Sequence, residues 1–354
     1  MRVVLPSRWV RLSDTHRLGF CFGDFVPVRR HTSRLRCSTV RAMSERCPAC
    51  TGPGRPLNLV VESRYRLLRC TMCGTQFFRR ECGAPGEAST VRDESEYWEA
   101  YKFGIYNDPA VREGFARRYA DVLELAERTV GPVRSIIDIG CGTGNFLDFA
   151  ARRGLRAVGV DLDDDAVSGA RARGLDAYTA SELDEVASAA IPTQFDALSM
   201  WDVVEHLIDP ASTLRSLFPR VREGGMLLFE TPDGGFSVRR AVLGLHRFSA
   251  ARIDLTRSMF YWEHRIYFTE RGFRQLMQRL GCEVVAVQRT TSVRETMSAV
   301  FAAEAAQGGR LDQRVLSKVW PALEGFSRTV GLGNRLIIVA RRGSRTPPEG
   351  SPAS

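Results

Sequence analysis

The stretch Ile136-Ile-Asp-Ile-Gly-Cys-Gly-Thr-Gly144 joins a predicted buried strand, Ser135–Ile139, to a predicted helix at residues 145–153. Glycines at such a junction let the backbone approach a ligand closely, and the first turn of the helix points its amide groups at that ligand. The next predicted strand ends in an acid, Asp161, whose carboxylate can accept both hydroxyls of a ribose. The sequence therefore predicts a site for a nucleoside-type ligand rather than a tight turn without one.

The order of residues in this loop favours S-adenosyl-L-methionine over a dinucleotide. A dinucleotide loop has the spacing G-x-G-x-x-G, whose third glycine lets the helix pack closely near a pyrophosphate. Here the spacing is D-x-G-x-G-x-G, with Asp138, Gly140, Gly142 and Gly144 at the fixed positions. The Asp138 carboxylate would repel a pyrophosphate, but it attracts the cationic amino group of a methionine. We therefore predict S-adenosyl-L-methionine as the cofactor, with these four residues in its site.

From Ser135 onward the chain alternates apolar strands with helices, which predicts a doubly wound α/β sheet. An amphipathic helix is expected before the fifth strand, and Gly224-Gly225 is expected to end it. The apolar face of that helix consists of Leu214, Leu217, Phe218 and Val221. A further helix is expected at residues 270–280. The predicted strands are residues 135–139, 157–161, 176–179, 196–201, 226–230, 283–287 and 335–340.

Several segments resemble the class I S-adenosylmethionine-dependent methyltransferases, especially the bacterial small-molecule branch that includes ubiquinone-type O-methyltransferases. The resemblance extends from about Ser135 to Arg341, and it is specific for the fold and the donor but not for the acceptor. It implies a Rossmann-like methyltransferase sheet that is mostly parallel, with an antiparallel last strand. The segments that carry it are IIDIGCGTG (136–144), VGVD (158–161), FDALSMWDVVEHLIDP (195–210), GGMLLFETP (224–232) and EHRIYF (263–268).

Carried over to this chain, the resemblance implies that the three loop glycines wrap the methionine portion of the donor. It implies that Asp161 holds the ribose and that Leu162 packs on the adenine. Trp201 and Asp202, just past the fourth strand, would border the donor methyl group. The chain departs from the family after the third strand, where Thr179-Ala-Ser-Glu182 stands in place of the usual acid. The contact to the adenine amine is therefore left open between Ser181 and Glu182.

His206 is the candidate catalytic base. Methyl transfer is an in-line displacement, so positioning can supply most of the catalysis, and a base adds about 10²–10⁴-fold for a hydroxyl acceptor. His206 and His264 each follow a glutamate within the segments that resemble the family. His206 falls at the carboxyl edge of the predicted sheet, where doubly wound folds bind ligands. The alternative is a histidine that packs a helix beside Leu207, and this packing role is the stronger interpretation for His264.

Two cysteine pairs precede the sheet, Cys47-Pro-Ala-Cys50 and, after a gap of 19 residues, Cys70-Thr-Met-Cys73. Four thiolates at this spacing can converge tetrahedrally on one Zn²⁺, and short strands predicted at residues 57–61 and 65–68 fit a zinc ribbon. Protein would fill all four ligand positions, so the zinc is expected to be structural rather than catalytic. Coincidental or redox-active cysteine pairs are the alternative.

The net charge of +9 resides mainly in residues 1–42, which hold nine arginines and only two acidic residues. The catalytic part is close to neutral, so a nucleic-acid partner is not expected, because phosphate binding needs clustered positive charge. The arm lacks the apolar core of a secretion signal, and no stretch reaches the ~18 apolar residues of a membrane span. Together with cysteines spaced for metal, these features predict a cytoplasmic protein.

We expect five regions along the chain. The first is a disordered Arg-rich extension, either an over-extended start before Met43 or an RNA-binding or targeting arm. A helical insertion within the catalytic domain, at residues 290–333, is expected to form a substrate lid, with a dimer interface or a core extension as alternatives. The regions are the extension (1–42), a zinc-ribbon-like module (43–82), a linker and helical cap (83–130), the methyltransferase domain (131–342) and a disordered tail (343–354).

These features predict an enzyme that methylates a small-molecule acceptor, such as a sugar, a quinone or a secondary-metabolite intermediate. An rRNA or tRNA methyltransferase is one alternative, since some of these carry N-terminal zinc modules. The near-neutral catalytic part and the sequence Trp201-Asp-Val-Val, in place of an Asn/Asp-Pro-Pro-Tyr motif, argue against it. The second alternative is a non-catalytic partner subunit that binds the donor, and the intact glycine loop argues against this alternative. A homodimer is left open.

Overall fold

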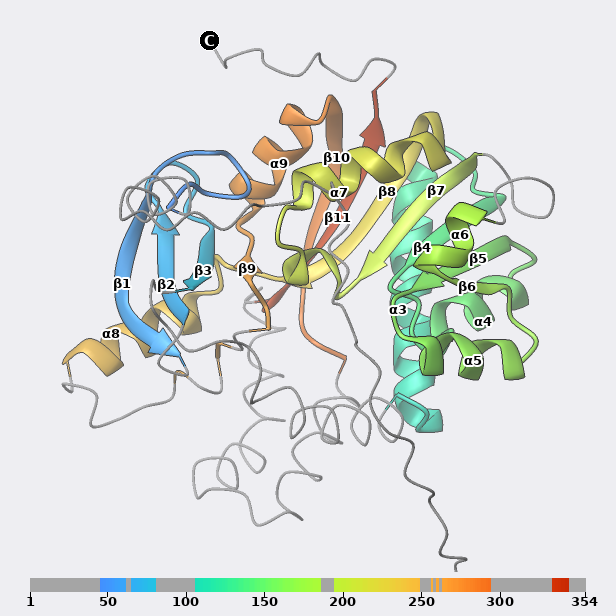
Figure 1. The fold of residues 1–354 in the computed structure, drawn as a ribbon, viewed down its shortest axis with the longest axis horizontal. Coiled ribbons are helices and arrows are strands. Elements are labelled where there is room, and N and C mark those ends of the chain that lie inside the picture. The colour runs from blue at the N-terminus through green and yellow to red at the C-terminus, as the bar shows by residue number, and fades with distance from the viewer. Residues whose placement is uncertain are drawn as a thin grey trace, which may run out of the picture. The chain divides into compact units, whose positions relative to one another are not determined.

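The described residues are 45–61, 65–80, 106–185, 194–248, 256, 259–260, 263–293 and 333–343 of a computed structural model, all in the compact unit Ser33–Ser354. Their larger sheet has seven strands in the order β10-β11-β8-β7-β4-β5-β6 (Figure 1). The strands from β6 to β8 are parallel, whereas β11 is antiparallel to both β8 and β10. The predicted fold class is therefore confirmed. The strands are β4 (Ser135–Ile139), β5 (Arg156–Asp161), β6 (Ala177–Thr179), β7 (Phe195–Trp201), β8 (Val221–Pro232), β10 (Cys282–Thr290) and β11 (Arg335–Arg342).

Strand β4 is the point at which the strand order reverses. The chain proceeds from β4 to β5 and β6 on one side and then returns to β7 on the other side of β4. In doubly wound sheets the ligand site lies outside the carboxyl end of the strand at such a switch point. The glycine loop that follows β4 therefore occupies this position.

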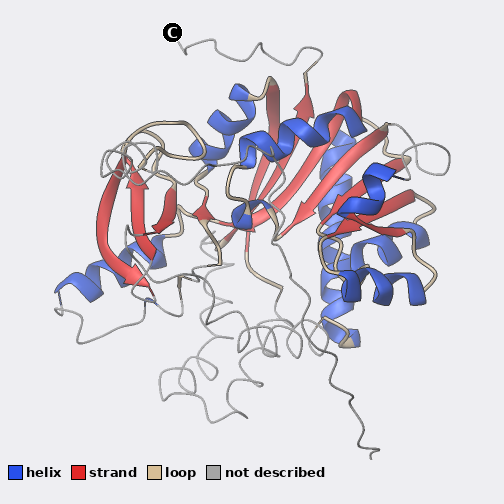
Figure 2. Ribbon diagram, viewed as in Figure 1, coloured by secondary structure: helices blue, strands red, loops and turns tan. Residues whose placement is uncertain are grey.

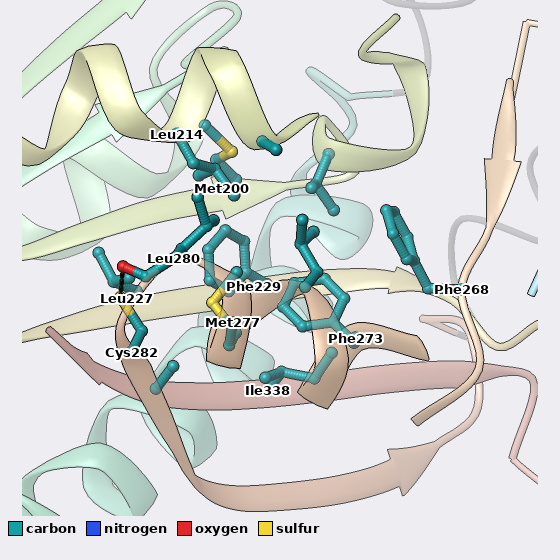
Figure 3. Packing of buried hydrophobic residues seen from close by; sticks show 14 of the residues in the cluster. Met200, Leu214, Leu227, Phe229, Phe268, Phe273, Met277, Leu280, Cys282 and Ile338 are labelled. Carbon is teal, nitrogen blue, oxygen red and sulfur yellow. Dashed lines mark hydrogen bonds between the residues drawn. The ribbon is translucent and has the colours of Figure 1, made fainter. Parts of the chain in front are cut away.

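Helices cover both faces of the sheet (Figure 2). Leu228 and Ile136 pack with residues of α3 and α4 on one face, while Leu227 and Phe229 pack with residues of α7 and α9 on the other (Figure 3). Alternate residues of β8 thus belong to different cores, as the two-residue period of a strand requires. The helices are α3 (Pro109–Thr129), α4 (Asn145–Arg152), α5 (Asp164–Ala172), α6 (Ala180–Glu185), α7 (Pro210–Leu217), α8 (Ser237–Phe248) and α9 (Glu270–Arg279), with short 3-10 turns η2 (Val204–His206) and η3 (Phe218–Arg220).

An aspartate followed by a proline begins two of these helices. The Asp108 side chain accepts hydrogen bonds from the first amides of α3, and the Asp209 side chain does the same for α7. Proline fits the first helical position because its missing N–H would have had no partner within the helix. Helix α3 therefore has a defined start, and its buried face packs on the sheet.

The helix before the fifth strand ends earlier than the sequence predicts. Helix α7 stops at Leu217, η3 follows with Pro219 inside it, and β8 already begins at Val221. Proline cannot donate a backbone hydrogen bond and clashes with the preceding turn, which explains the early stop. Gly224 instead lies within β8 with a φ of 71°, near a register shift against β7. The prediction that Gly224-Gly225 ends a helix with Val221 on its face was wrong.

A second sheet has the strand order β1-β2-β3-β9 (Figure 1). Its strands are β1 (Gly54–Val61), β2 (Tyr65–Cys70), β3 (Gln76–Arg80) and β9 (Ile266–Tyr267), all antiparallel to their neighbours. One cysteine pair precedes β1, and the other lies at the turn between β2 and β3. The two strands predicted between the cysteine pairs are confirmed by β1 and β2, whereas β3 and β9 were not predicted. We call residues 45–61 and 65–80 the cysteine module. Because β9 comes from the catalytic part of the chain, the module is joined to that part by strand pairing.

Several predictions lie outside the described residues, wholly or in large part. They concern the extension at 1–42, the linker at 83–105, most of the insertion at 290–333 with its lid, and all but the first residue of the tail at 343–354. Within the described part of the chain, none of the helices combines the length and the apolar character that crossing a membrane requires.

Gly272 provides a test of the junction between the cysteine module and α9. A Cβ there would lie 2.0 Å from Oγ1 of the buried Thr75 and 3.2 Å from Sγ of Cys73, whereas a Cβ at Gly244 of α8 would meet nothing within 4 Å. We expect Gly272→Ala to lower the free energy of unfolding by about 1–3 kcal/mol. Gly244→Ala, the control, should raise it by about 0.5–1 kcal/mol through helix propensity. Urea denaturation of both variants measures the difference, and equal stability would contradict the close packing.

Candidate functional site

The three glycines of the loop after β4 all have left-handed backbone angles, with φ of 75°, 52° and 84° at Gly140, Gly142 and Gly144. A Cβ at Gly140 would lie 2.4 Å from Val203, and one at Gly144 would lie 2.5 Å from Leu175. A Cβ at Gly142 would meet nothing within 4 Å. The first and third glycines are therefore required by packing, whereas Gly142 faces open space at the switch point.

Asp161 lies directly against this loop. Its Oδ2 accepts a hydrogen bond of 2.7 Å from the backbone N–H of Gly142, and its Oδ1 accepts one of 3.0 Å from Asp163. Leu162, the next residue, is 72% exposed although it is a large apolar side chain. The structure thus brings the loop, an acid and an exposed apolar side chain together at one edge of the sheet.

Asp138 is buried at the end of β4, where Ser199 Oγ donates a 2.6 Å hydrogen bond to its Oδ1. Burial raises the pKa of this carboxyl to about 8, and the negative charge of Asp161 acts in the same direction. At neutral pH the carboxyl is therefore mostly protonated. A cation bound beside it would favour the ionised form.

Trp201 is the last residue of β7, on the other side of β4 from β5, and Asp202 follows it. The Trp201 ring lies 4.8 Å from Tyr119 and 5.2 Å from Phe146, and its indole N–H is buried without a hydrogen-bond partner among the described residues. Asp202 has a φ of 57°, an uncommon angle for a residue other than glycine, and its amide donates to the carbonyl of Glu230.

A buried ion network lies beside Asp202, and the sequence analysis missed it. Arg335 of β11 forms ion pairs with both Asp202 and Glu230, and Arg118 of α3 lies 2.8 Å from Glu230. Glu230 is 3% exposed and lies in the buried, mostly apolar second half of β8. An acid in an apolar strand was the only sequence signal for this network. Its arginine partners come from distant segments.

His206 ends η2 at the same edge of the sheet. Its Nδ1 lies 2.9 Å from the carbonyl oxygen of Glu263, which can only accept a hydrogen bond. Nδ1 therefore carries a proton, and in the neutral ring the lone pair is on Nε2. The ring also meets His264 edge-on at 4.8 Å. Burial lowers the pKa of His264 well below its usual value, with the charges of His206 and Arg239 adding to the effect.

Glu205 completes a cluster with these two histidines. It is fully buried, and Thr231 Oγ1 donates a 3.0 Å hydrogen bond to its Oε2. Burial raises the pKa of Glu205 to about 8. One polar atom from each of Glu205, His206 and His264 lies within 4.8 Å of the others. The two Glu-His pairs of the sequence were the signal, but only the fold brings them together.

The four cysteines of the two pairs converge in the cysteine module. The Sγ atoms of Cys47 and Cys73 lie 3.6 Å apart, those of Cys50 and Cys70 lie 3.4 Å apart, and all four lie within 4.8 Å of one another. Hydrogen bonds from Cys47 and Thr75 lower the pKa of Cys73 to about 5. Four clustered sulfurs, with one thiolate already favoured, form a donor set that suits Zn²⁺.

Comparison with known proteins supports this description. The family model described as Methyltransferase domain matches residues 111–287, half of the chain. The ubiquinone biosynthesis O-methyltransferase of Stutzerimonas stutzeri is 35% identical over 104 residues, which are 28% of this chain and 44% of that protein. The protein of the same name from Alkalilimnicola ehrlichii is 35% identical over 103 residues, 28% of this chain and 41% of that protein.

The chain thus matches less than half the length of these relatives. A solved structure of a SAM dependent methyltransferase from Archaeoglobus fulgidus is similar over 70% of this chain and 100% of that chain, at 17% identity and a TM-score of 0.44. The matched family region contains the glycine loop, Asp161 and His206. This chain therefore belongs to the class I S-adenosylmethionine-dependent methyltransferases.

Proposed function

We propose that this chain transfers a methyl group from S-adenosylmethionine to a small-molecule acceptor, such as a sugar, a quinone or a secondary-metabolite intermediate. One observation carries the donor assignment. The Asp161 carboxylate is held against the open face of Gly142 at the switch point of the sheet. A ribose acid and a backbone that a ligand can approach closely are thus combined in one place.

The residues around the loop fit the parts of the donor. Gly140, Gly142 and Gly144 would wrap the methionine portion, and Asp161 would exchange its backbone hydrogen bonds for the ribose hydroxyls. The exposed Leu162 would regain an apolar contact on the adenine. Asp138, buried beneath the loop, would ionise when the donor ammonium approaches.

The acceptor side lies at Trp201, Asp202 and His206. When bound, the donor supplies a methyl group attached to a sulfonium sulfur, which is the leaving group when the acceptor attacks the methyl carbon in line. The chain's main contribution is to hold the reactants in near-attack geometry. His206 would remove the acceptor proton through Nε2, because the Glu263 carbonyl keeps the other ring proton on Nδ1. The buried indole N–H of Trp201 would donate a hydrogen bond to a group bound here.

A small acceptor is supported by the charge pattern and by the relatives. Several exposed arginines of the described part form ion pairs with acids, for example Arg171 with Glu182 and Arg274 with Glu270. Paired arginines attract phosphates less than unpaired ones. The matched relatives are named ubiquinone biosynthesis O-methyltransferases, over the part of their length that this chain covers.

The test of this function uses purified full-length protein and donor labelled at the methyl group, offered to a metabolite extract and, separately, to total RNA. We expect label to enter the small-molecule fraction and to be lost when Asp161 or His206 is replaced by asparagine. Label in RNA alone would make the chain an RNA methyltransferase. Donor binding without transfer to either fraction would indicate a non-catalytic subunit.

We also propose that Cys47, Cys50, Cys70 and Cys73 bind one structural Zn²⁺. The convergence of the four sulfurs supports this proposal. Protein fills every ligand position, so the ion would stabilise the cysteine module and would not contact the acceptor.

The zinc proposal predicts one zinc per chain in fresh protein that has not met a chelator. Replacing Cys70 and Cys73 together by serine should abolish binding and the order of β1–β3, since metal binding and local folding are coupled. Cys282→Ser, at a buried cysteine of β10, is the control that should retain the metal. Elemental analysis gives the stoichiometry, and wild-type protein without zinc would refute the assignment.

Gly142→Val should abolish donor binding while the protein stays folded. The branched side chain would fill the open space that the ligand requires, and we expect affinity for S-adenosylhomocysteine to fall by roughly 100-fold or more, about 2.7 kcal/mol. Gly154→Val is the matched control, because Gly154 also has a positive φ, of 73°, and open space, but lies before β5, near the amino ends of the strands, where Arg156 pairs with Ser135. Calorimetry that finds equal affinity in both variants would contradict the donor site.

Asp138 predicts a pH dependence of donor binding. Its pKa of about 8 means that the carboxyl is protonated at pH 7 and must lose that proton to pair with the donor ammonium. Affinity should therefore rise as pH increases toward 8, by up to about tenfold per unit. Calorimetry in buffers of different ionisation enthalpy should detect close to one proton released at pH 7. Asp138→Asn should bind weakly with no such release; an unchanged release from this variant would exclude Asp138 as its source.

A further inference from the structure

We propose that the cysteine module positions the candidate base: it holds the segment Glu263–Thr269 in place, and this segment fixes the tautomer of His206. The inference rests on the proposed role of His206, and it gives the module a function beyond its own stability. Three separate connections lead from the module to His206.

The first connection is strand pairing. Strand β9 has only two residues. Among the described strands it pairs with β3 of the module alone, with Gln76 opposite Tyr267 and Phe77 opposite Ile266. The amide of Phe78 also donates a 2.8 Å hydrogen bond to the carbonyl of Arg265. A two-residue strand has too few hydrogen bonds to hold its own position. The module therefore helps to fix the backbone just after His264, together with the 2.8 Å hydrogen bond from the Gly234 amide to the Phe268 carbonyl.

The second connection is helix α9, which is bonded to both cysteine pairs. At its start, Thr269 Oγ1 donates a 2.7 Å hydrogen bond to the carbonyl of Cys73 and accepts one from the amide of Gly272. In its last turn, Arg279 donates to the carbonyl of Ala49 at 2.7 Å and more weakly to that of Pro48. Each end of α9 is thus fixed to one Cys-x-x-Cys turn, and Thr269 is also the end of the segment in question.

The third connection is a row of ring contacts. Phe78 of β3 meets Tyr267 edge-on at 6.5 Å, Tyr267 lies 5.8 Å from His264, and His264 lies 4.8 Å from His206. Phe78 and Tyr267 are almost completely buried, so their rings cannot move independently. The ring contacts therefore link the module to His206 in addition to the backbone hydrogen bonds.

The path ends at the hydrogen bond between His206 Nδ1 and the Glu263 carbonyl, which is 2.9 Å long. Imidazole in water populates both neutral tautomers, so this carbonyl selects the one that leaves the lone pair on Nε2. A shift of the segment by about 1 Å would lengthen the contact beyond hydrogen-bond range. The carbonyl would then no longer keep the lone pair of His206 on Nε2, although the ring would still be present.

A purely structural module would behave differently. Its residues Leu68 and Phe77 share one apolar core with Phe273 and Leu276 of α9, so weakening the junction will lower stability in either case. Only the positioning role requires that the tautomer of His206 change as well. The decisive measurement is therefore spectroscopic and does not depend on knowing the acceptor.

The experiment uses full-length protein labelled with ¹⁵N-histidine, in which long-range proton–nitrogen spectra report the protonated ring nitrogen. The chain has five histidines, and the signal lost in His206→Gln assigns His206. Arg279→Gln and Thr269→Val each remove one bond between α9 and the module, and Arg279→Lys keeps a cationic donor. Arg271→Gln, at an exposed position of the same helix, is the control. Zinc content and affinity for S-adenosylhomocysteine are measured on every sample.

We expect wild type, Arg271→Gln and Arg279→Lys to hold the proton on Nδ1 of His206. In Arg279→Gln and Thr269→Val the ratio of the Nδ1–H to the Nε2–H form should fall by about fivefold or more, the factor that one hydrogen bond supplies. Affinity for S-adenosylhomocysteine should change by less than about twofold, because the glycine loop makes none of these contacts.

An unchanged His206 tautomer in both variants would overturn the proposal, whether or not their stability falls. The other measurements keep the remaining proposals separate. Wild-type protein without zinc would refute the metal assignment, and wild-type protein that does not bind S-adenosylhomocysteine would refute the donor site. The link to His206 is still tested in both cases, since it consists of contacts between protein groups.

Discussion

The pairing of β4 with a parallel strand on each side is the constraint on which the rest of the molecule depends. It makes β4 the point of reversal, so that the chain leaving its carboxyl end must turn sharply above the sheet. The amides of Gly140 and Cys141 both donate hydrogen bonds to the carbonyl of Val160 in β5, and these bonds fix the turn against the end of β5. Left-handed angles at the three glycines follow from that geometry. Because of this turn, Gly142 faces open space and lies next to Asp161.

The same edge of the sheet concentrates buried acids. Asp138, Glu205 and Glu230 are each almost fully buried, and burial raises the pKa of each. Burying a carboxyl group opposes folding unless it is protonated, paired or hydrogen-bonded. Glu230 is paired with two arginines, whereas Asp138 and Glu205 each accept a hydrogen bond from a hydroxyl group. Such groups cluster where a protein binds or transforms a ligand, which agrees with the proposed donor and acceptor sides.

The cysteine module is too small to bury a hydrophobic core of its own, and its apolar side chains instead join the cores of the catalytic part. One face of its sheet contributes Leu68 and Phe77 to the core beneath α9, and the other contributes Leu67 and Phe78 to a cluster with Phe260 and Tyr267. A strand from the catalytic part completes its sheet. The proposed metal would therefore stabilise a structure that reaches the acceptor side of the site.

The sequence alone predicted the strands of the larger sheet, β1, β2, the glycine loop and its acid, because each depends on local periodicity or on residues close along the chain. It did not predict β3. It misplaced the end of α7, since a glycine pair outweighed Pro219, and it did not predict the two-residue β9. The Glu230 network with Arg118 and Arg335, and the meeting of His206 with Glu263 and His264, join segments far apart in the chain. Only the tertiary structure decides such contacts, because no local pattern of residues records which distant segments a sheet will bring side by side.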